Sequence, residues 1–295
     1  MRTLRDVLKD AEKTGVAVPH FNISETAGLK AVVEAVRGLK LPALVGVSEG
    51  ERAFIGVRQV AALVKSYREE FGIELFLNAD HTHSLAAAQE AAKAGFDEVL
   101  FDASALPFAQ NITETKNAVE ILKSISPSVL VEAEIGFIGN SSEIHDKAPE
   151  GLGVLTNPAD AKEFVNATHI DVLAPAVGNM HGMLKSMVAG TAKKHVDSKR
   201  IAEIKQATGI FLTLHGGSGT DDEDFKSAIR AGITIIHINT ELRLAWRRGL
   251  EAALRAQPDE VAPYKILPGA VDAVKQVVVD RMKLFNSKQA SAAGR

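Results

Sequence analysis

Short apolar runs alternate with amphipathic stretches along almost the whole chain. The apolar runs predict eight buried strands, at residues 16–22, 42–48, 73–78, 98–102, 129–135, 172–178, 210–214 and 234–240. The stretches between and after them predict helices at 3–14, 25–39, 51–70, 84–95, 108–124, from 158, 198–207, from 221, 241–256 and 268–285. This alternation predicts one α/β domain over residues 1–286, a (β/α)8 TIM barrel, and the small polar residues 287–295 predict a disordered tail.

Residues at the expected helix ends support these boundaries. Ser24 is suited to cap the second helix, with Glu25 in its first turn. Ser84 is suited to cap an Ala-rich helix that stops near Gly95, and Pro158 stands where a helix begins.

Two connections are longer than a barrel needs. They run from residue 136 to 157 and from 178 to about 198, and the first contains three glycines in its interior. Long loops with glycines at the mouth of a barrel are candidates for lids that close over substrate. For the first loop, a mobile surface loop without a function is an equally good interpretation.

Three of the predicted strands end in histidine. His81 follows the third strand, His181 the sixth and His215 the seventh. Barrel strands converge on one mouth, so these imidazoles are expected to meet there. Three protein ligands with an open position are typical of a catalytic zinc site. His83 is an alternative to His81 as the first ligand, because it lies on the same side of a continued strand.

Carboxylates surround this predicted metal centre. Asp80 lies next to the first histidine, where a general acid/base is needed, and Ser84 already serves as the cap of the next helix. Glu132 and Glu134 alternate on the fifth strand and therefore face the barrel interior together, while Asp102 ends the fourth strand. Charged groups there are costly unless they are paired or functional, so we expect partners for the histidines or an alternative position for a second divalent metal.

A glycine-rich turn predicts an anion site beside the metal. Gly216-Gly217-Ser218-Gly219 follows the seventh strand and Asn239-Thr240 follows the eighth, where barrels commonly bind phosphate. Gly182 and Lys185, just beyond the second histidine, lie where they could close on the same anion. No strand end carries a lysine, so a Schiff-base mechanism has no evident nucleophile.

Composition narrows the class of protein. The chain has no cysteine, so a metal must be held by His, Asp or Glu. A formal net charge of −3 gives no reason to expect nucleic acid or an anionic membrane as a partner. The charged N-terminal residues and the lack of a long apolar run predict a cytoplasmic protein.

As a set, these features resemble the class II, metal-dependent ketose-bisphosphate aldolases, which act on fructose or tagatose bisphosphate. The resemblance covers about residues 4–285. It depends on six short motifs, which are Pro19-His20-Phe21-Asn22, Asp80-His81, Val131-Glu132-Ala133-Glu134-Ile135-Gly136, Val177-Gly178-Asn179-Met180-His181-Gly182, Leu214-His215-Gly216-Gly217-Ser218 and Asn239-Thr240-Glu241-Leu242.

The resemblance implies roles for these residues. It places zinc on His81, His181 and His215, with Asp80 as the catalytic acid/base. It also implies a homodimer or homotetramer, and a monovalent cation, Na⁺ or K⁺, near the phosphate of dihydroxyacetone phosphate. The substrate-binding residues expected on this basis are Asn22, Gly182, Lys185, Gly216, Gly217, Ser218, His237, Asn239 and Thr240.

Three positions depart from the family pattern. His237 stands where the family has an asparagine. Pro268 aligns with the arginine that meets the far phosphate, which leaves Lys265 as the nearest cation in the sequence and predicts a weaker preference for bisphosphates. The loop at 139–143 lacks the usual Gly-Gly and acidic cluster, so that Glu143 is the candidate for its mobile acid.

The predicted reaction is the reversible aldol cleavage of a ketose phosphate, with fructose 1,6-bisphosphate giving dihydroxyacetone phosphate and glyceraldehyde 3-phosphate. Alternative substrates are tagatose bisphosphate and a ketose 1-phosphate. A metal-dependent barrel hydrolase is a rival, since His81-Thr82-His83 is a His-x-His pair, but the pair lies on strand three and strand eight ends without the expected aspartate. A non-catalytic phosphosugar-binding protein is a third reading, which the complete set of Asp80 and three histidines disfavours.

Overall fold

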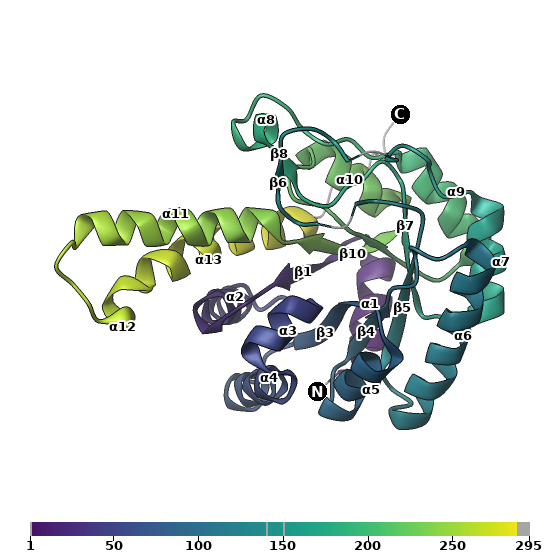
Figure 1. Ribbon diagram of the computed structural model, residues 1–295, viewed down its shortest axis with the longest axis horizontal. Coiled ribbons are helices and arrows are strands. Elements are labelled where there is room, and N and C mark those ends of the chain that lie inside the picture. Colours follow the sequence, from purple (N-terminus) through teal and green to yellow (C-terminus); the bar gives the residue numbers. More distant parts are fainter. Residues whose placement is uncertain (1, 140, 150, 288–295) are drawn as a thin grey trace.

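Eight parallel strands form the wall of a closed barrel in a computed structural model, which describes residues 2–139, 141–149 and 151–287. Their order around the wall is β1-β10-β9-β7-β5-β4-β3-β2 (Figure 1). This confirms the predicted (β/α)8 fold. The strands are β1 Val18–Asn22, β2 Ala43–Val47, β3 Leu75–Thr82, β4 Glu98–Phe101, β5 Leu130–Ile135, β7 Val172–Pro175, β9 Phe211–Leu214 and β10 Ile233–Ile238.

Helices surround this wall, and their apolar sides pack on its outer face in one large core. Most were predicted within a few residues, including the helix that begins at Pro158. Their bounds are α1 Leu4–Thr14, α2 Thr26–Leu39, α3 Glu49–Ile55, α4 Val57–Phe71, α5 Leu85–Ala94, α6 Phe108–Ile125, α7 Pro158–Thr168, α8 Lys185–Val188, α9 Ser198–Thr208, α10 Asp222–Ala231, α11 Thr240–Ala256, α12 Pro263–Ile266 and α13 Pro268–Phe285.

The amino-terminal helix α1 closes the bottom of the barrel. Its buried residues Leu4, Val7 and Leu8 form a second core with the first residues of several strands, among them Val18 and Phe76. The N-terminal ends of the strands are thereby sealed by apolar packing. Their C-terminal ends, where the polar residues lie, are left to form a site.

Two local predictions were wrong. The segment 51–70 is two helices, α3 and α4, because Gly56 takes a left-handed φ of 96° that ends one helix before the next begins. The cap of α2 is Glu25 and not Ser24: the Glu25 carboxylate accepts the N–H groups of Ala27 and Gly28 at 2.5 and 2.6 Å. The positive end of the helix dipole also stabilises a carboxylate at this position.

The two long connections meet each other over the barrel mouth. Strand β6 (Ile144–His145) of the first pairs in parallel with β8 (Met183–Leu184) of the second. Gly182 allows this approach, since a Cβ there would lie 2.4 Å from the carbonyl oxygen of Glu143. Asn140, which belongs to the predicted lid, lies outside the described residues.

Helices α11, α12 and α13 form an arm that extends away from the barrel (Figure 1). Lys265 lies on α12, at the far end of this arm, and Pro268 opens α13. No helix of the described segments is long and apolar enough to cross a membrane. The predicted tail lies outside the described residues, except for Ser287.

Candidate metal centre

The third strand carries a bulge at the point where its chemistry begins. The pairing of β3 with β4 shifts between Ala79 and Thr82, and His81 has a left-handed φ of 37°. In a regular strand, Asp80 and His81 would point to opposite faces. The bulge turns both toward the mouth, where Asp80 Oδ1 lies 3.9 Å from His81 Nε2. Strain of this kind concentrates at functional sites.

The structure brings together the three histidines predicted from the strand ends. His81, His181 and His215 form a cluster in which each can offer one nitrogen to a metal ion. The two Nε2 atoms of His81 and His181 lie 3.2 Å apart. Two nitrogens bound tetrahedrally to one zinc at about 2.0–2.1 Å would be separated by about 3.4 Å. The spacing therefore fits a single metal ion.

Hydrogen bonds leave one ring nitrogen of each histidine free for a metal. His81 Nδ1 donates to Asp102 Oδ2 at 2.7 Å, and His181 Nδ1 donates to the carbonyl of Gly139 at 2.6 Å, because a carbonyl can only accept. His215 Nε2 lies 2.6 Å from Glu132 Oε1. We assign the proton to these nitrogens, which leaves Nε2 of His81, Nε2 of His181 and Nδ1 of His215 as ligand atoms.

The electrostatics of the cluster favour a positive charge at its centre. Burial lowers the pKa of His181 and of His215 to about 3, with further lowering by neighbouring imidazoles, and so keeps both in the neutral form that binds metal. Burial also opposes protonation of His81, but Asp80 and Asp102 outweigh it and raise its pKa to about 10. The carboxylates that stabilise a proton on His81 would also stabilise a divalent cation bound at the cluster.

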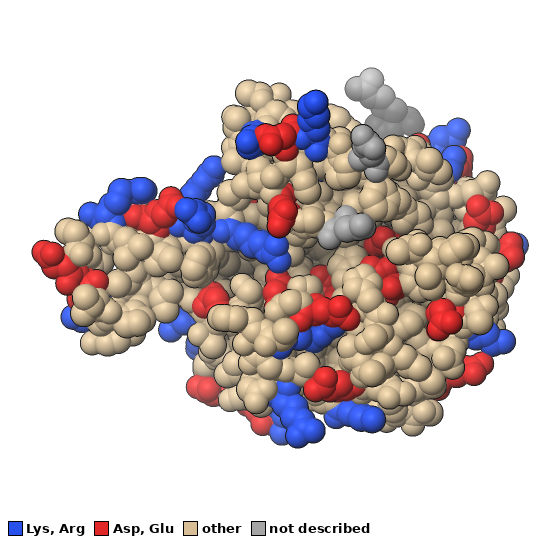
Figure 2. Space-filling view, in the orientation of Figure 1, with Lys and Arg blue, Asp and Glu red and all other residues tan. Residues whose placement is uncertain are grey.

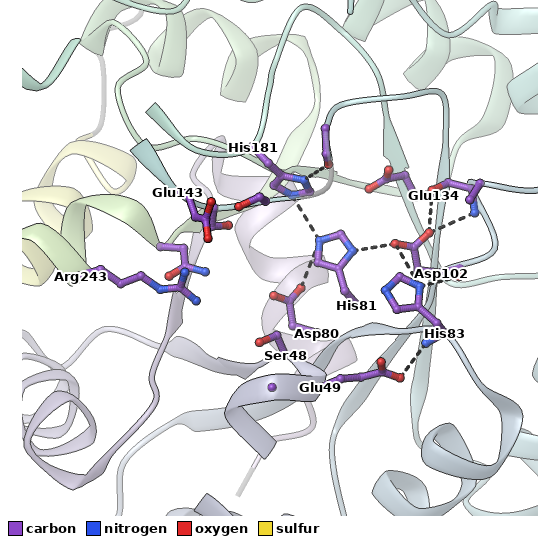
Figure 3. A pocket seen from close by; sticks show the side chains of 17 residues that line it. Ser48, Glu49, Asp80, His81, His83, Asp102, Glu134, Glu143, His181 and Arg243 are labelled. Atoms are coloured by element: carbon purple, nitrogen blue, oxygen red, sulfur yellow. Dashed lines mark hydrogen bonds and ion pairs between the residues drawn. The ribbon is translucent and has the colours of Figure 1, made fainter. Parts of the chain in front are cut away.

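His83 does not join this cluster. Its side chain is 59% exposed, and its Nδ1 lies 3.2 Å from the backbone carbonyl of Asp102. Figure 3 shows its ring below the Asp102 carboxylate and away from His181. The geometry therefore favours His81 over His83 as the first ligand of a metal ion.

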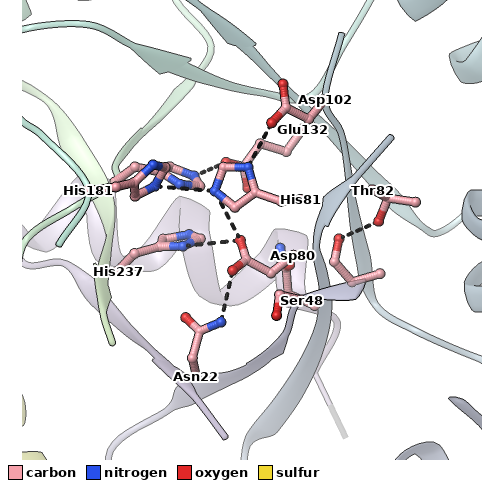
Figure 4. A network of polar contacts seen from close by, with 12 residues as sticks. Asn22, Ser48, Asp80, His81, Thr82, Asp102, Glu132, His181 and His237 are labelled. Carbon is pink, nitrogen blue, oxygen red and sulfur yellow. Dashed lines mark hydrogen bonds and ion pairs between the residues drawn. The ribbon is translucent and has the colours of Figure 1, made fainter. Parts of the chain in front are cut away.

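Asp80 is buried at the edge of the cluster without belonging to the three-histidine group. Its Oδ2 accepts a 2.8 Å hydrogen bond from Asn22 Nδ2, while its Oδ1 has no hydrogen-bond partner within the described chain (Figure 4). Burial raises the pKa of Asp80, but the lowering by His81, His20 and His215 is larger. The pKa of Asp80 therefore lies well below its ordinary value. One carboxylate oxygen is therefore held by a hydrogen bond, and the other lies 3.6 Å from His237 Nδ1 and 3.9 Å from His81 Nε2 without a hydrogen bond.

The other three carboxylates considered in the sequence, Asp102, Glu132 and Glu134, lie close to His81 or His215. Asp102 holds His81, and its second oxygen accepts from the N–H and hydroxyl of Ser104. Asp102, Glu134 and His81 also form a second group that could hold a metal ion. Burial raises the pKa of both Glu132 and Glu134 well above the ordinary value.

A column of three imidazoles behind the metal cluster was not predicted. His237, which replaces the family asparagine, stacks between His20 (ring centroids 3.5 Å apart) and the ligand His215 (3.9 Å). Gly46 leaves the room for this column, because a Cβ there would lie 2.0 Å from the His20 ring. Burial lowers the pKa of His20 to about 4 and that of His237 well below its ordinary value, so both rings are neutral. The column therefore supports the His215 ring by stacking and adds no charge beside it.

The predicted anion site adjoins the cluster. The described residues that line a small pocket there include His81, Gly182, Gly216, Ser218, His237 and Asn239. Helix α11 points its first turn into this pocket, and Ser218 Oγ accepts the N–H groups of Asn239 and Glu241 at 3.2 Å each. The Ser218 hydroxyl proton remains available to an anion.

Some predicted anion contacts are used within the protein. The N–H of Gly217 donates to the carbonyl of His237, and the hydroxyl of Thr240 donates to the carbonyl of Ser142 on the first long loop. Lys185 does not line the pocket: its side chain is 69% exposed and pairs with Asp146 at 2.6 Å. The predicted close contact of Lys185 with the anion is therefore not seen in this arrangement.

A larger cavity of about 520 Å³ opens from the cluster toward the surface and is hollowed into the face seen in Figure 2. Asp80, His81 and His181 lie on its wall, and Glu143 reaches it from the first long loop and Arg243 from helix α11 (Figure 3). Its size suits a small organic ligand. Arg243 pairs with Glu51 at 2.8 Å, and Glu51 in turn accepts from Asn22.

Comparison with known proteins identifies the family. The family model described as "Fructose-bisphosphate aldolase class-II" matches residues 2–290. The chain belongs to the class II fructose-bisphosphate aldolase family. This confirms the resemblance found in the sequence.

Individual relatives cover nearly the whole aldolase chain. A probable fructose-bisphosphate aldolase of Bacillus subtilis (strain 168) is 34% identical over 288 residues, with 97% of each chain covered. A fructose-bisphosphate aldolase of Geobacillus stearothermophilus is 32% identical over 293 residues, with 98% of each covered. The crystal structure of the YdjI aldolase from Escherichia coli K12 superimposes with a TM-score of 0.81 at 28% identity and 97% coverage of each chain.

Membership of the aldolase family decides between the classes of enzyme left open by the sequence. The chain is an aldolase-type lyase, not a barrel hydrolase or a non-catalytic sugar-binding protein. Of the His81-Thr82-His83 pair that suggested a hydrolase, only His81 lies in the bulge and in the cluster, and His83 lies outside both.

The aldolase structure makes a prediction about Glu132. Glu132→Leu removes the acceptor that holds His215 and is expected to weaken metal binding by about 10–100-fold, the usual effect of losing a partner of a ligand. Glu132→Gln keeps an acceptor oxygen and should bind metal nearly as well as wild type. Competition with a metal-binding dye measures both affinities. Equal affinity of Glu132→Leu and wild type would show that the contact does not position His215.

Proposed function

We propose that this aldolase catalyses zinc-dependent, reversible cleavage of fructose 1,6-bisphosphate into dihydroxyacetone phosphate and glyceraldehyde 3-phosphate. The observation that carries the proposal is the convergence of His81, His181 and His215 beside the Asp80 carboxylate, next to an anion pocket. The names of the relatives support the substrate. The expected cytoplasmic location and homodimer or homotetramer are part of the same proposal.

His81, His181 and His215 would hold the zinc ion, and their neutral nitrogens suit it better than Mg²⁺ or Ca²⁺, which prefer oxygen. A bound zinc supplies Lewis acidity for the ketone of the substrate. Asp102 and Glu134 with His81 offer the proposed second divalent position.

Asp80 is the acid/base of the proposal. In cleavage, its Oδ1, which makes no hydrogen bond within the described chain, takes the proton of the C4 hydroxyl while the C3–C4 bond breaks and the electron pair of that bond passes toward the C2 carbonyl. Asn22 holds the other oxygen and so fixes the direction of the carboxylate. In condensation, the same oxygen returns the proton to the new hydroxyl. Glu143, on the loop over the cavity, is the proposed acid for the proton exchange at C3.

The anion pocket would bind the phosphate of the three-carbon product. The N-terminus of α11 and the Ser218 hydroxyl supply the positive end of a dipole and a donor. Held there, the substrate's C1 end lies beside the three histidines, and the rest of the sugar extends into the larger cavity.

Turnover across a panel of phosphorylated ketoses tests this proposal. Zinc-loaded protein is expected to cleave fructose 1,6-bisphosphate with the highest kcat/KM, and coupled assays for both triose phosphates measure it. A higher kcat/KM for tagatose 1,6-bisphosphate, or for a ketose 1-phosphate, would replace the proposed substrate with that sugar.

Arg243 is the residue expected to bind the far phosphate of the substrate. Lys265, the substitute suggested by the sequence, pairs with Glu260 at the end of the arm, whereas Arg243 lies on the cavity wall. A charge-assisted hydrogen bond contributes about 1.5–3 kcal/mol. Arg243→Ala is therefore expected to lower kcat/KM for fructose 1,6-bisphosphate by about 10–100-fold.

Fructose 1-phosphate is the control for this prediction, since it lacks the far phosphate. Its kcat/KM should change little in Arg243→Ala, and Lys265→Ala should leave both substrates unaffected. Equal losses for both substrates in Arg243→Ala would contradict the assignment and point instead to the contact of Arg243 with Glu51.

A further inference from the structure

Lys194 is buried beside the anion pocket. It lies in the second long loop, and only 4% of it is exposed. Its Nζ donates to three backbone carbonyls, those of Met180 at 2.7 Å, Gly182 at 2.6 Å and Gly216 at 2.8 Å. Lysine is almost never this buried without a carboxylate partner.

Three acceptors require the charged form of this amine. A neutral amine has two N–H groups, whereas an ammonium has three, one for each carbonyl. Burial lowers the pKa of Lys194 to about 7, and Glu241 acts in the opposite direction. The Glu241 carboxylate is itself used by Arg281, with two hydrogen bonds of 2.9 Å. The direct partners of the ammonium are therefore carbonyl dipoles.

The three carbonyls belong to the two loops that form the site. Met180 and Gly182 flank the ligand His181, and Gly216 follows the ligand His215. The Lys194 backbone is anchored as well, since its N–H donates to the carbonyl of Gly219 at 2.9 Å. A ring of backbone carbonyls that replaces a hydration shell is how proteins bind alkali cations.

We propose that the Lys194 ammonium is a built-in cation that takes the place of a monovalent metal ion beside the anion pocket. It joins the loop after β7 to the loop after β9 and places a positive charge next to the phosphate. The Na⁺ or K⁺ implied by the family resemblance is then not needed by this chain. The inference rests on the proposed phosphate site, but not on the identity of the sugar.

Binding of inorganic phosphate to the zinc-loaded protein, measured by calorimetry, tests this without turnover. Wild type is expected to bind phosphate equally well in Na⁺, K⁺ and tetramethylammonium buffers. Lys194→Met, which fills the space without charge, should bind about 10–100-fold more weakly in all three. Lys194→Ala should bind as weakly in tetramethylammonium but regain at least part of the loss in K⁺ or NH₄⁺, which fit the opened carbonyl ring.

Lys193→Ala is the matched control, because Lys193 is the exposed neighbour, and it should behave as wild type. Zinc content and thermal unfolding of each variant show whether the fold and the metal centre are kept. A wild type that binds phosphate more tightly in K⁺ than in tetramethylammonium would overturn the proposal, and this result needs no variant. Unchanged phosphate affinity in a folded Lys194→Met would also overturn it. Failure of the aldolase assay would leave these binding results valid.

Discussion

Replacing Asp80 by alanine is expected to lower kcat by about 10²–10⁴-fold while the protein keeps its metal. The reason is that the three histidines form the group that could hold the metal ion, whereas Asp80 lies beside this group with an Oδ1 that makes no hydrogen bond within the described chain. The measurement is kcat for fructose 1,6-bisphosphate together with zinc content by atomic absorption.

A competing geometry makes this prediction informative. Asp80 also forms a group with His20 and His237 that could hold a metal ion. If Asp80→Ala purifies without zinc and cannot be reloaded, Asp80 is a ligand and the assignment of roles is wrong. Asn22→Ala, which frees the second oxygen of Asp80, should keep zinc and lose less activity than Asp80→Ala.

Replacing His215 by alanine is expected to remove metal and activity together. His215 supplies one of three ligand nitrogens, and a site with two histidines should lose more than the 10–100-fold in affinity that follows loss of a ligand's partner. Dialysed His215→Ala protein should therefore contain little zinc and show only background turnover.

His83→Ala is the matched control for this experiment. It removes a histidine two residues from a ligand, but one that is largely exposed and outside the cluster. It should retain zinc and most of the activity. Loss of zinc in His83→Ala, with full zinc in His81→Ala, would show that the first ligand is His83 and would contradict the geometry.

Much of the barrel could be predicted because the hydrophobic pattern of each strand and helix lies within one short stretch of sequence. Each strand is a short apolar run, each helix has an apolar stripe, and their alternation leaves few folds. The convergence of His81, His181 and His215 follows from the rule that parallel strands end at one mouth. The helix break at Gly56 was missed because a glycine inside an apolar pattern does not reveal its φ.

The residues that were missed depend on distances between strands and loops. The stacking of His20 on His237 needs the register of β1 against β10, which pairs these two residues but leaves no mark on either strand alone. Lys194 lies in a loop without a motif, and its role emerges only from the three carbonyls around it. Nothing in the sequence distinguishes Arg243 from other charged residues of α11, and its place on the cavity wall follows only from the fold.

Metal removal and reconstitution tests the central claim most directly. Purified protein is dialysed against a strong chelator, freed of chelator and assayed for cleavage of fructose 1,6-bisphosphate before and after one equivalent of zinc is added. We expect background turnover in the metal-free protein and full activity near one zinc per three-histidine site. Full activity of the metal-free protein, or a substrate adduct trapped by borohydride, would contradict metal-dependent cleavage at His81, His181 and His215.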